Sequence, residues 1–164
     1  MIEVKPVDPE EPVASALISS YFDELDLLLP DGFEESRNDP PNPKKMRPPD
    51  GAFLVLYDGD EPIGCGGLRY LSVGVGELRR MWIVSSLRGT GLGRALLEAL
   101  ESTARGLGFC ELRLDTSRPL TAARSLYLSA GYVDMPSYNR DEYADYWMSK
   151  AITGPRRQPP GSDR

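Results

Sequence analysis

The stretch Arg88-Gly89-Thr90-Gly91-Leu92-Gly93-Arg94 stands between an apolar strand pattern over residues 78–84 and an amphipathic helix pattern over residues 92–107. Glycines in alternate positions permit unusual turn dihedrals and keep side chains away from an approaching ligand. The first amides of a helix have no intrahelical partner and carry the positive end of the helix dipole. A strand, a glycine turn and a helix start therefore predict an anion site suited to phosphate.

Two common phosphate-binding motifs do not fit this stretch. The Walker motif requires a lysine after its glycines, and none follows here. The dinucleotide fingerprint requires Gly-x-Gly-x-x-Gly, whereas the spacing here is Gly-x-Gly-x-Gly. Asp115 does stand where a dinucleotide-binding fold would place its ribose-binding acid. About half of the chain precedes the glycines, however, so a dinucleotide-binding reductase is the weaker alternative.

The glycine stretch resembles the acyl-coenzyme A motif of the GCN5-related N-acetyltransferases (GNAT), Arg/Gln-x-x-Gly-x-Gly/Ala, over residues 88–93. Residues 77–84 are similar to that family's fourth strand, and residues 123–132 to its late helix and the strand that follows. The similarity covers most of residues 1–150. It implies an α/β fold in which a twisted, mostly antiparallel sheet contains one parallel, splayed strand pair and is flanked by helices.

Length and composition predict one GNAT-like domain over residues 1–150 and a disordered tail over residues 151–164. No apolar run is long enough to span a membrane, and no export signal is visible, which favours the cytoplasm. The chain has no histidine and two cysteines, which excludes the usual zinc site and every histidine-dependent triad or dyad. No metal is therefore expected. Cys65 and Cys110 lie in apolar strand patterns, and both are predicted to be buried free thiols.

The acidic residues are concentrated at the start of the chain. Residues 1–50 carry 12 acids and 5 basic residues, within a net charge of -6. This half of the chain would attract a cationic amine and repel nucleic acid. An acidic, solvated surface without a ligand explains the same charge equally well.

Periodicity predicts the remaining elements. A proline-rich loop is expected over residues 33–50, and the strand at 109–115 should run parallel to that at 75–84, because a helix crosses over between them. The expected helices cover residues 12–29, 92–107 and a segment that opens at Ser117 or Arg118 and ends before Gly131. The expected strands cover residues 2–7, 51–57, 62–71, 75–84, 109–115, a segment from 132 and 143–149.

The resemblance implies where acetyl-coenzyme A would bind. The pantetheine arm would pair with the backbone of Met81, Trp82 and Ile83, and one of these amides would polarise the thioester carbonyl. The amides of residues 88–94 would hold the pyrophosphate. Many members of the family have an asparagine seven residues before the catalytic tyrosine, and this chain has Leu120 there. Arg118 or Arg124 could replace the missing contact.

Two residues are implied as catalytic. Tyr127 stands where the family commonly places its general acid, and Glu77 where several members use a general base. Glu77 and Ile83 are six residues apart, which places them on one strand face unless a bulge intervenes. If neither residue is catalytic, Tyr127 is a core residue and Glu77 is a solvated residue at the start of a strand.

The acceptor site is expected in the long loop and before the last strand. Phe33, Glu34 and Glu35 are candidates because that region lines the acceptor pocket in the resembled family. Tyr138 belongs to a polar and aromatic cluster that could border the same entrance. The predicted reaction is direct acetyl transfer from acetyl-coenzyme A to a primary amine of a small molecule or peptide. The alternative is a non-catalytic acyl-coenzyme A sensor, and a homodimer is compatible with either.

Overall fold

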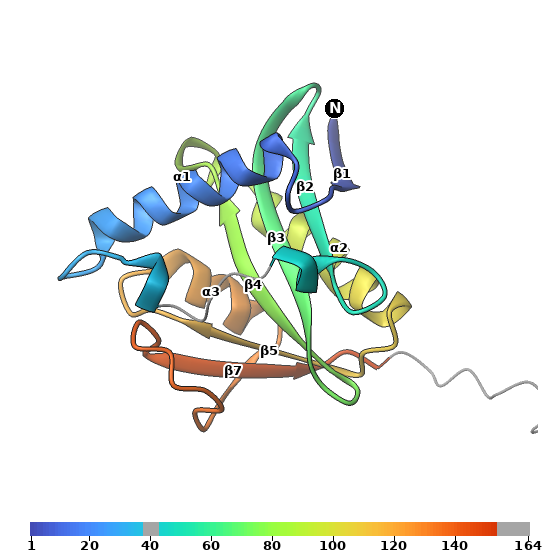
Figure 1. Ribbon diagram of the computed structural model, residues 1–164, viewed down its shortest axis with the longest axis vertical. Coiled ribbons are helices and arrows are strands. Elements are labelled where there is room, and N and C mark those ends of the chain that lie inside the picture. The colour runs from blue at the N-terminus through green and yellow to red at the C-terminus, as the bar shows by residue number, and fades with distance from the viewer. Residues whose placement is uncertain (38–42, 154–164) are drawn as a thin grey trace, which may run out of the picture.

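The computed structural model describes residues 1–37 and 43–153. Its centre is a seven-stranded sheet in the order β1-β2-β3-β4-β5-β7-β6 (Figure 1). Within the described residues every neighbouring pair is antiparallel except β4 and β5, which are parallel as the helical crossover predicted. The strands are β1 (Ile2–Pro6), β2 (Ala52–Asp58), β3 (Glu61–Ser72), β4 (Val75–Ile83), β5 (Glu111–Thr116), β6 (Val133–Met135) and β7 (Tyr146–Ala151). This is the mixed α/β sheet that the resemblance implied.

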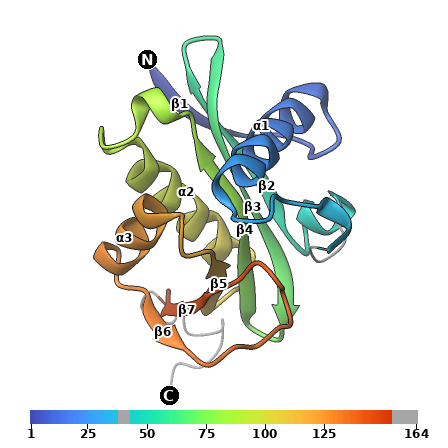
Figure 2. The ribbon, with the colours of Figure 1, turned by 90° about the vertical axis from the view of Figure 1, so that its left-hand side faces the viewer.

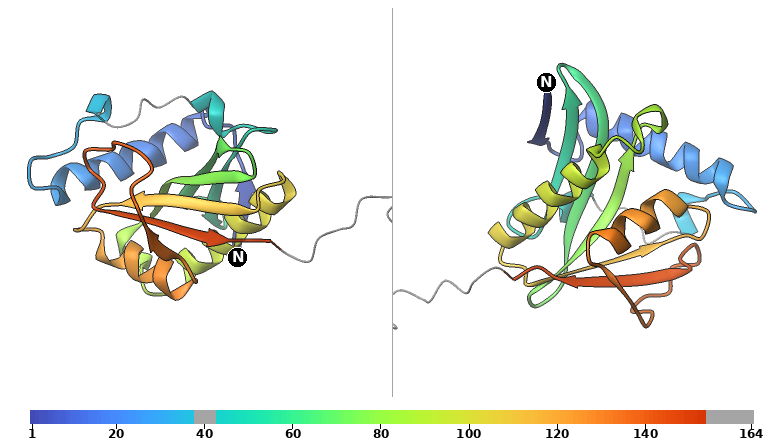
Figure 3. Two further views of the ribbon diagram at one scale, coloured as in Figure 1. Left: turned by 90° about the horizontal axis from the view of Figure 1, so that it is seen from below. Right: turned by 180° about the vertical axis from the view of Figure 1, so that it is seen from behind.

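Helices cover both faces of the sheet (Figure 2). Helix α1 (Pro12–Leu28) lies on one face, and α2 (Leu92–Gly106) and α3 (Thr121–Ser129) lie on the other (Figure 3). Helical spacing produces this arrangement: α1 buries Ala14, Leu17 and Ile18 on the first face, and α2 buries a leucine stripe on the second. Short 3₁₀ turns occur at η1 (Glu35–Arg37), η2 (Pro43–Met46) and η3 (Ser85–Leu87). No helix in the described part of the chain is long and apolar enough to cross a membrane.

The parallel strands β4 and β5 separate soon after they meet. Their pairing joins residues Val75, Gly76 and Glu77 to the first half of β5. Beyond Glu77 the two strands diverge, so that β5 and β7 run across the lower end of β4 (Figure 1). Among the described residues, the backbone groups of β4 beyond Glu77 therefore have no strand partner on the β5 side.

Strand β4 also contains a bulge. Its register with β3 shifts between the pairs Gly67–Arg79 and Cys65–Trp82, so two residues of β4 oppose one of β3. Arg80, in the bulge, has a φ of 55°, a left-handed conformation that is uncommon outside glycine.

The bulge reverses the alternation of side chains along β4. Leu78 and Ile83 are five residues apart, yet both pack in the core under α2. The neighbouring Glu77 points to the opposite face from Leu78, as successive strand residues do. The expectation that Glu77 and Ile83 share a face is therefore wrong.

Several boundaries differ from the sequence-based expectation. The thiol of Cys65 is buried, but Cys110 is exposed, because it precedes β5 and lies outside that strand's alternation. Helix α3 begins at Thr121, later than expected, and β7 begins at Tyr146 after a turn. β7 extends to residue 151, and Ile152 is buried. Residues 154–164, the rest of the predicted tail, lie outside the described part.

Candidate active site

The glycine turn has the local geometry that an anion site requires. Gly89 and Gly91 have φ angles of 79° and 87°, which explains glycine at both positions. Gly91 is the N-cap of α2, and no side chain caps the helix, so its first amides keep their capacity to bind a ligand. The amide of Arg88 differs, because it donates to the Ser85 carbonyl at 3.3 Å.

A cavity of about 540 Å³ opens between β4, the glycine turn, α1 and α3. The residues predicted to bind acetyl-coenzyme A line it, in the segments 81–83 and 88–94, except Thr90 and Leu92. The end of β4, beyond its pairing with β5, forms one side of this cavity. Strand, turn and helix start thus face one continuous space.

Glu24 of α1 lines one wall of this cavity. Its carboxylate accepts hydrogen bonds from Arg88 Nη2, at 2.7 Å to each oxygen, and from Trp82 Nε1 at 3.1 Å. The Arg88 side chain also donates to the Ile83 carbonyl. These contacts fix the arginine at the start of the motif and tie α1 to the glycine turn.

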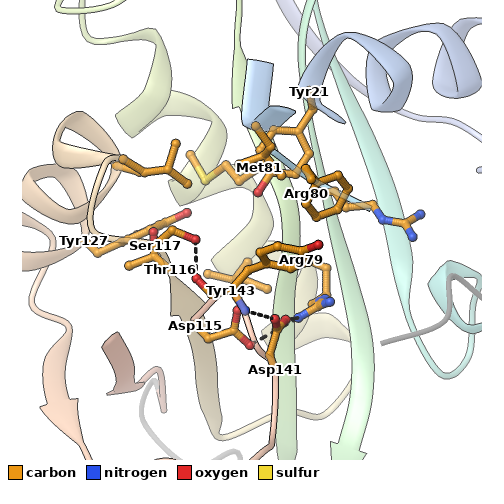
Figure 4. Close-up of a pocket in the computed structure, with 15 residues that line it drawn as sticks. Tyr21, Arg79, Arg80, Met81, Asp115, Thr116, Ser117, Tyr127, Asp141 and Tyr143 are labelled. Carbon is orange, nitrogen blue, oxygen red and sulfur yellow. Dashed lines mark hydrogen bonds and ion pairs between the residues drawn. The ribbon is translucent and has the colours of Figure 1, made fainter. Parts of the chain in front are cut away.

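A smaller inner cavity of about 60 Å³ adjoins the first (Figure 4). Tyr127 lines both cavities, together with Tyr21, Met81, Leu120 and Ala123. The Tyr127 side chain is 6% exposed. Burial, with smaller contributions from Tyr21 and Asp115, raises the pKa of Tyr127 above that of an ordinary phenol. The phenol therefore stays protonated at the junction of the two cavities.

The sequence analysis placed Glu77 and Tyr138 at the active site. In the structure these two residues contact each other, but neither lines a cavity. Glu77 is fully buried. Its carboxylate accepts a 2.8 Å hydrogen bond from Arg69 Nε and a 2.7 Å bond from the Tyr138 hydroxyl, and it lies 3.6 Å from Arg79 Nε. Neither Glu77 nor Tyr138 is among the residues that line the cavities. Any base catalysis by Glu77 would have to pass through an intermediary.

Asp115 is one of two carboxylates, with Asp141, that line the inner cavity. Its Oδ2 atom accepts hydrogen bonds from Arg79 Nη1 at 3.2 Å and Asn139 Nδ2 at 2.8 Å. Burial raises the pKa of Asp115, and the Arg79 guanidinium opposes that rise. The sequence singled out Asp115 only as a ribose-binding acid, because nothing local indicated that the end of β5 faces Tyr127.

Phe33 and Glu34, two acceptor-side candidates of the long loop, have different surroundings. The Phe33 ring lines the inner cavity and contacts the rings of Phe22 and Tyr143, each at 4.9 Å between centroids. The Glu34 carboxylate instead lies 3.4 Å from Arg37, and its backbone N–H donates to the Tyr143 hydroxyl at 2.9 Å. Phe33 is thus a wall residue, and Glu34 helps to dock the loop.

Leu120 occupies the position of the family asparagine and lines both cavities. The Arg124 side chain is directed to Asp134, at 2.8 and 3.0 Å, and Arg118 lines neither cavity. Neither arginine lines the cavity in which the missing contact would be made. Within the described residues no cluster of three or more histidine, cysteine or carboxylate side chains is suited to a metal ion.

Comparison with known proteins agrees with this geometry. The chain matches the Acetyltransferase (GNAT) family over residues 18–132. It is 32% identical over 126 residues to the IAA acetyltransferase of Azospirillum brasilense, an alignment that covers 76% of this chain and 82% of that protein.

Two solved structures share the fold. A GNAT-family acetyltransferase from Staphylococcus aureus superposes with a TM-score of 0.76 at 13% identity, over 93% of this chain and all of that one. The PaiA N-acetyltransferase from Thermoplasma acidophilum, solved in complex with coenzyme A, has a TM-score of 0.69 at 19% identity, over 92% and 99% of the chains.

Proposed function

The chain belongs to the acetyltransferase (GNAT) family, and from this premise we propose that it transfers the acetyl group of acetyl-coenzyme A to a primary amine of a small molecule or peptide. The amine attacks the thioester directly while both substrates are bound. One observation carries the proposal: beyond Glu77, β4 leaves β5 and borders a cavity of about 540 Å³ that ends at the glycine turn.

The walls of this cavity suit the parts of acetyl-coenzyme A. The open edge of β4 offers backbone groups to the amides of a pantetheine arm, and the uncapped start of α2 offers N–H donors to a pyrophosphate. A thioester laid along β4 would bring its sulfur to the junction where Tyr127 stands. An amide of residues 81–83 would stabilise the negative charge that develops on the carbonyl oxygen.

Proton movements then assign roles to two side chains. Asp115 takes a proton from the bound ammonium group, and the free amine attacks the thioester carbon. As the carbon–sulfur bond breaks, the Tyr127 phenol gives its proton to the departing sulfur, and the second amine proton restores the phenol. We favour Asp115 over Glu77 as the base because Asp115 lines the inner cavity, whereas Glu77 is enclosed by Arg69 and Tyr138.

Isothermal titration tests the coenzyme site. We expect acetyl-coenzyme A to bind with a micromolar dissociation constant, and S-acetylpantetheine, which lacks the pyrophosphate, to bind at least about 100-fold more weakly, because hydrogen bonds to charged groups contribute roughly 1.5–3 kcal/mol each. Failure of acetyl-coenzyme A to bind below millimolar concentration would refute the proposal. Binding without turnover across a broad amine panel would instead indicate a non-catalytic sensor.

The pH dependence of kcat/KM identifies the base. Asp115→Asn should lower kcat/KM roughly 100-fold at pH 7, within the range known for general bases. The deficit should shrink as the pH rises towards the pKa of the amine, because the substrate then arrives already neutral. In the wild type, protonation of Asp115 should reduce kcat on the acid side, at a pH above the ordinary range for aspartate because its pKa is raised.

Glu77→Gln is the matched variant for this test, since it makes the same carboxylate-to-amide change outside the cavity. Its kcat should fall at acid pH in the same way as the kcat of the wild type. If Glu77→Gln shows the pH-dependent deficit and Asp115→Asn does not, the base is Glu77, acting through water.

A further inference from the structure

Two consecutive arginines line the inner cavity, and their charges are compensated differently. Arg79 Nη1 lies 3.2 Å from Asp115 and 3.9 Å from Asp141, so two carboxylates compensate its charge. All three residues line the inner cavity. The Arg80 guanidinium lies over the Phe22 ring, 5.3 Å from its centroid. Among residues 1–37 and 43–153, no carboxylate stands within the 4.0 Å of an ion pair with Arg80.

The position of Arg80 is energetically unfavourable without a partner. It occupies the β4 bulge with a φ of 55°, a left-handed backbone conformation that is strained for most residues other than glycine. Burial and the neighbouring Arg79 charge both lower the pKa of Arg80, which shows that its charged form is disfavoured there. The exposed Glu35 opposes this effect, but burial and Arg79 contribute more. A strained, partly desolvated cation at a cavity wall is typical of a binding site for an anion.

The charge balance of the cavity limits what that anion can be. Arg79 and Arg80 face Asp115 and Asp141, so a ligand with no net charge fits better than a dianion. Figure 4 shows the Arg80 guanidinium at the opposite edge of the drawn residues from the Tyr127 phenol, extending outward from them. A small molecule with an ammonium group at one end and a carboxylate at the other would match both sides.

We propose that the acceptor is an amino acid, whose carboxylate is bound by Arg80 while its amine lies between Asp115 and Tyr127. This inference rests on the proposed acetyl transfer and specifies its substrate class. The planar guanidinium can donate two parallel hydrogen bonds to a carboxylate. The Phe22 ring beside it holds the guanidinium in place, and the Phe33 ring forms the adjoining wall.

Matched acceptor pairs test the proposal. Glycine, β-alanine, γ-aminobutyrate and phenylalanine are each compared with the corresponding carboxamide, which keeps the amine and removes the negative charge. Transfer is followed by loss of the acetyl-coenzyme A thioester. For at least one pair, wild-type kcat/KM should be roughly 10- to 100-fold higher for the amino acid, as expected for a charge-assisted hydrogen-bonded pair.

Arg80→Gln should remove this preference, mainly by raising KM for the amino acid, and should lower kcat/KM for the carboxamide much less, because the neutral group loses no ionic contact. Arg80→Lys, which keeps the charge but loses the planar fork, should fall between the two. Arg80 does not line the coenzyme cavity, so acetyl-coenzyme A affinity and the melting temperature serve as folding controls. Should the variant fail to fold, the wild-type preference within each pair still decides the question.

The outcomes separate this inference from the proposed function. Equal rates within every pair, or an unchanged preference in Arg80→Gln, would overturn the carboxylate site. Transfer to carboxamides alone would overturn it too, yet would leave N-acetyl transfer intact. If acetyl-coenzyme A binds and none of these amino acids or carboxamides is acetylated, the carboxylate site is refuted, and the broad amine panel then decides the proposed acetyl transfer.

Discussion

Tyr127→Phe is expected to lower kcat by about 100-fold or more, as loss of a general acid does, and to leave the affinity for acetyl-coenzyme A within a factor of about two. The substitution removes only the phenolic hydroxyl group. The Tyr127 ring keeps its edge-to-face contact with Tyr132, at 5.8 Å between centroids. No hydrogen bond from the Tyr127 hydroxyl to another described residue would be lost, so the fold should be unaffected.

The size of the effect follows from the leaving group. A thiol has an ordinary pKa near ~8.5 and a phenol near ~10, and the structure raises the pKa of Tyr127 further. Full proton transfer to a stable thiolate would therefore be uphill, but donation becomes favourable as charge builds on sulfur inside a cavity with little water. Because the raised pKa keeps Tyr127 protonated, wild-type activity should show no alkaline loss from this residue up to about pH 9.

Tyr132→Phe is the matched control, since it makes the same change on the adjacent ring. The Tyr132 side chain is 2% exposed and lines neither cavity, and its hydroxyl has no hydrogen-bond partner among the described residues. Removing that hydroxyl should leave kcat unchanged and raise the free energy of unfolding by up to about 1 kcal/mol, because an unsatisfied buried donor is lost. Equal kcat for Tyr127→Phe and the wild type would remove Tyr127 from the mechanism.

The geometry of the glycine turn could be predicted because its signals are local. A glycine turn, the strand before it and the helix after it are consecutive in the chain, and the contacts they offer are backbone groups that no neighbouring side chain has to complete. Gly89 and Gly91 adopt the predicted unusual dihedrals. The same locality explains why the parallel crossover from β4 through α2 to β5 was correctly anticipated.

The inner cavity could not be predicted, because its walls come from distant segments. Phe33, Arg80 and Asp115 meet only when the loop after α1, the β4 bulge and the end of β5 fold together. The bulge itself leaves no clear signal in the sequence, since a strand period of two assumes an uninterrupted ladder. Glu77 looked suitable by position, and its enclosure by Arg69 and Tyr138 depends on pairing between β3 and β4 and on the chain ahead of β7.

Gly51→Ala is expected to lower the free energy of unfolding by about 3 kcal/mol or more, at the upper end of overpacking effects. A Cβ atom at Gly51 would lie 2.1 Å from the Leu68 carbonyl oxygen and 2.3 Å from the Lys45 carbonyl oxygen. Both neighbours are backbone atoms, so no side chain can rotate away. The residue must also keep its N–H donation to the Arg47 carbonyl, at 2.8 Å, which holds the turn after η2 against the sheet.

Gly106→Ala should change the free energy of unfolding in the opposite direction. Gly106 ends α2 and has nothing within 4 Å of an added Cβ, so alanine there should raise the free energy of unfolding by roughly 0.5–1 kcal/mol. Urea denaturation followed by circular dichroism measures both changes. Saturating acetyl-coenzyme A should stabilise the two variants equally, because neither glycine lines its cavity. An unchanged midpoint for Gly51→Ala would mean that the entry to β2 can move by about an ångström, a freedom that close-packed backbone does not have.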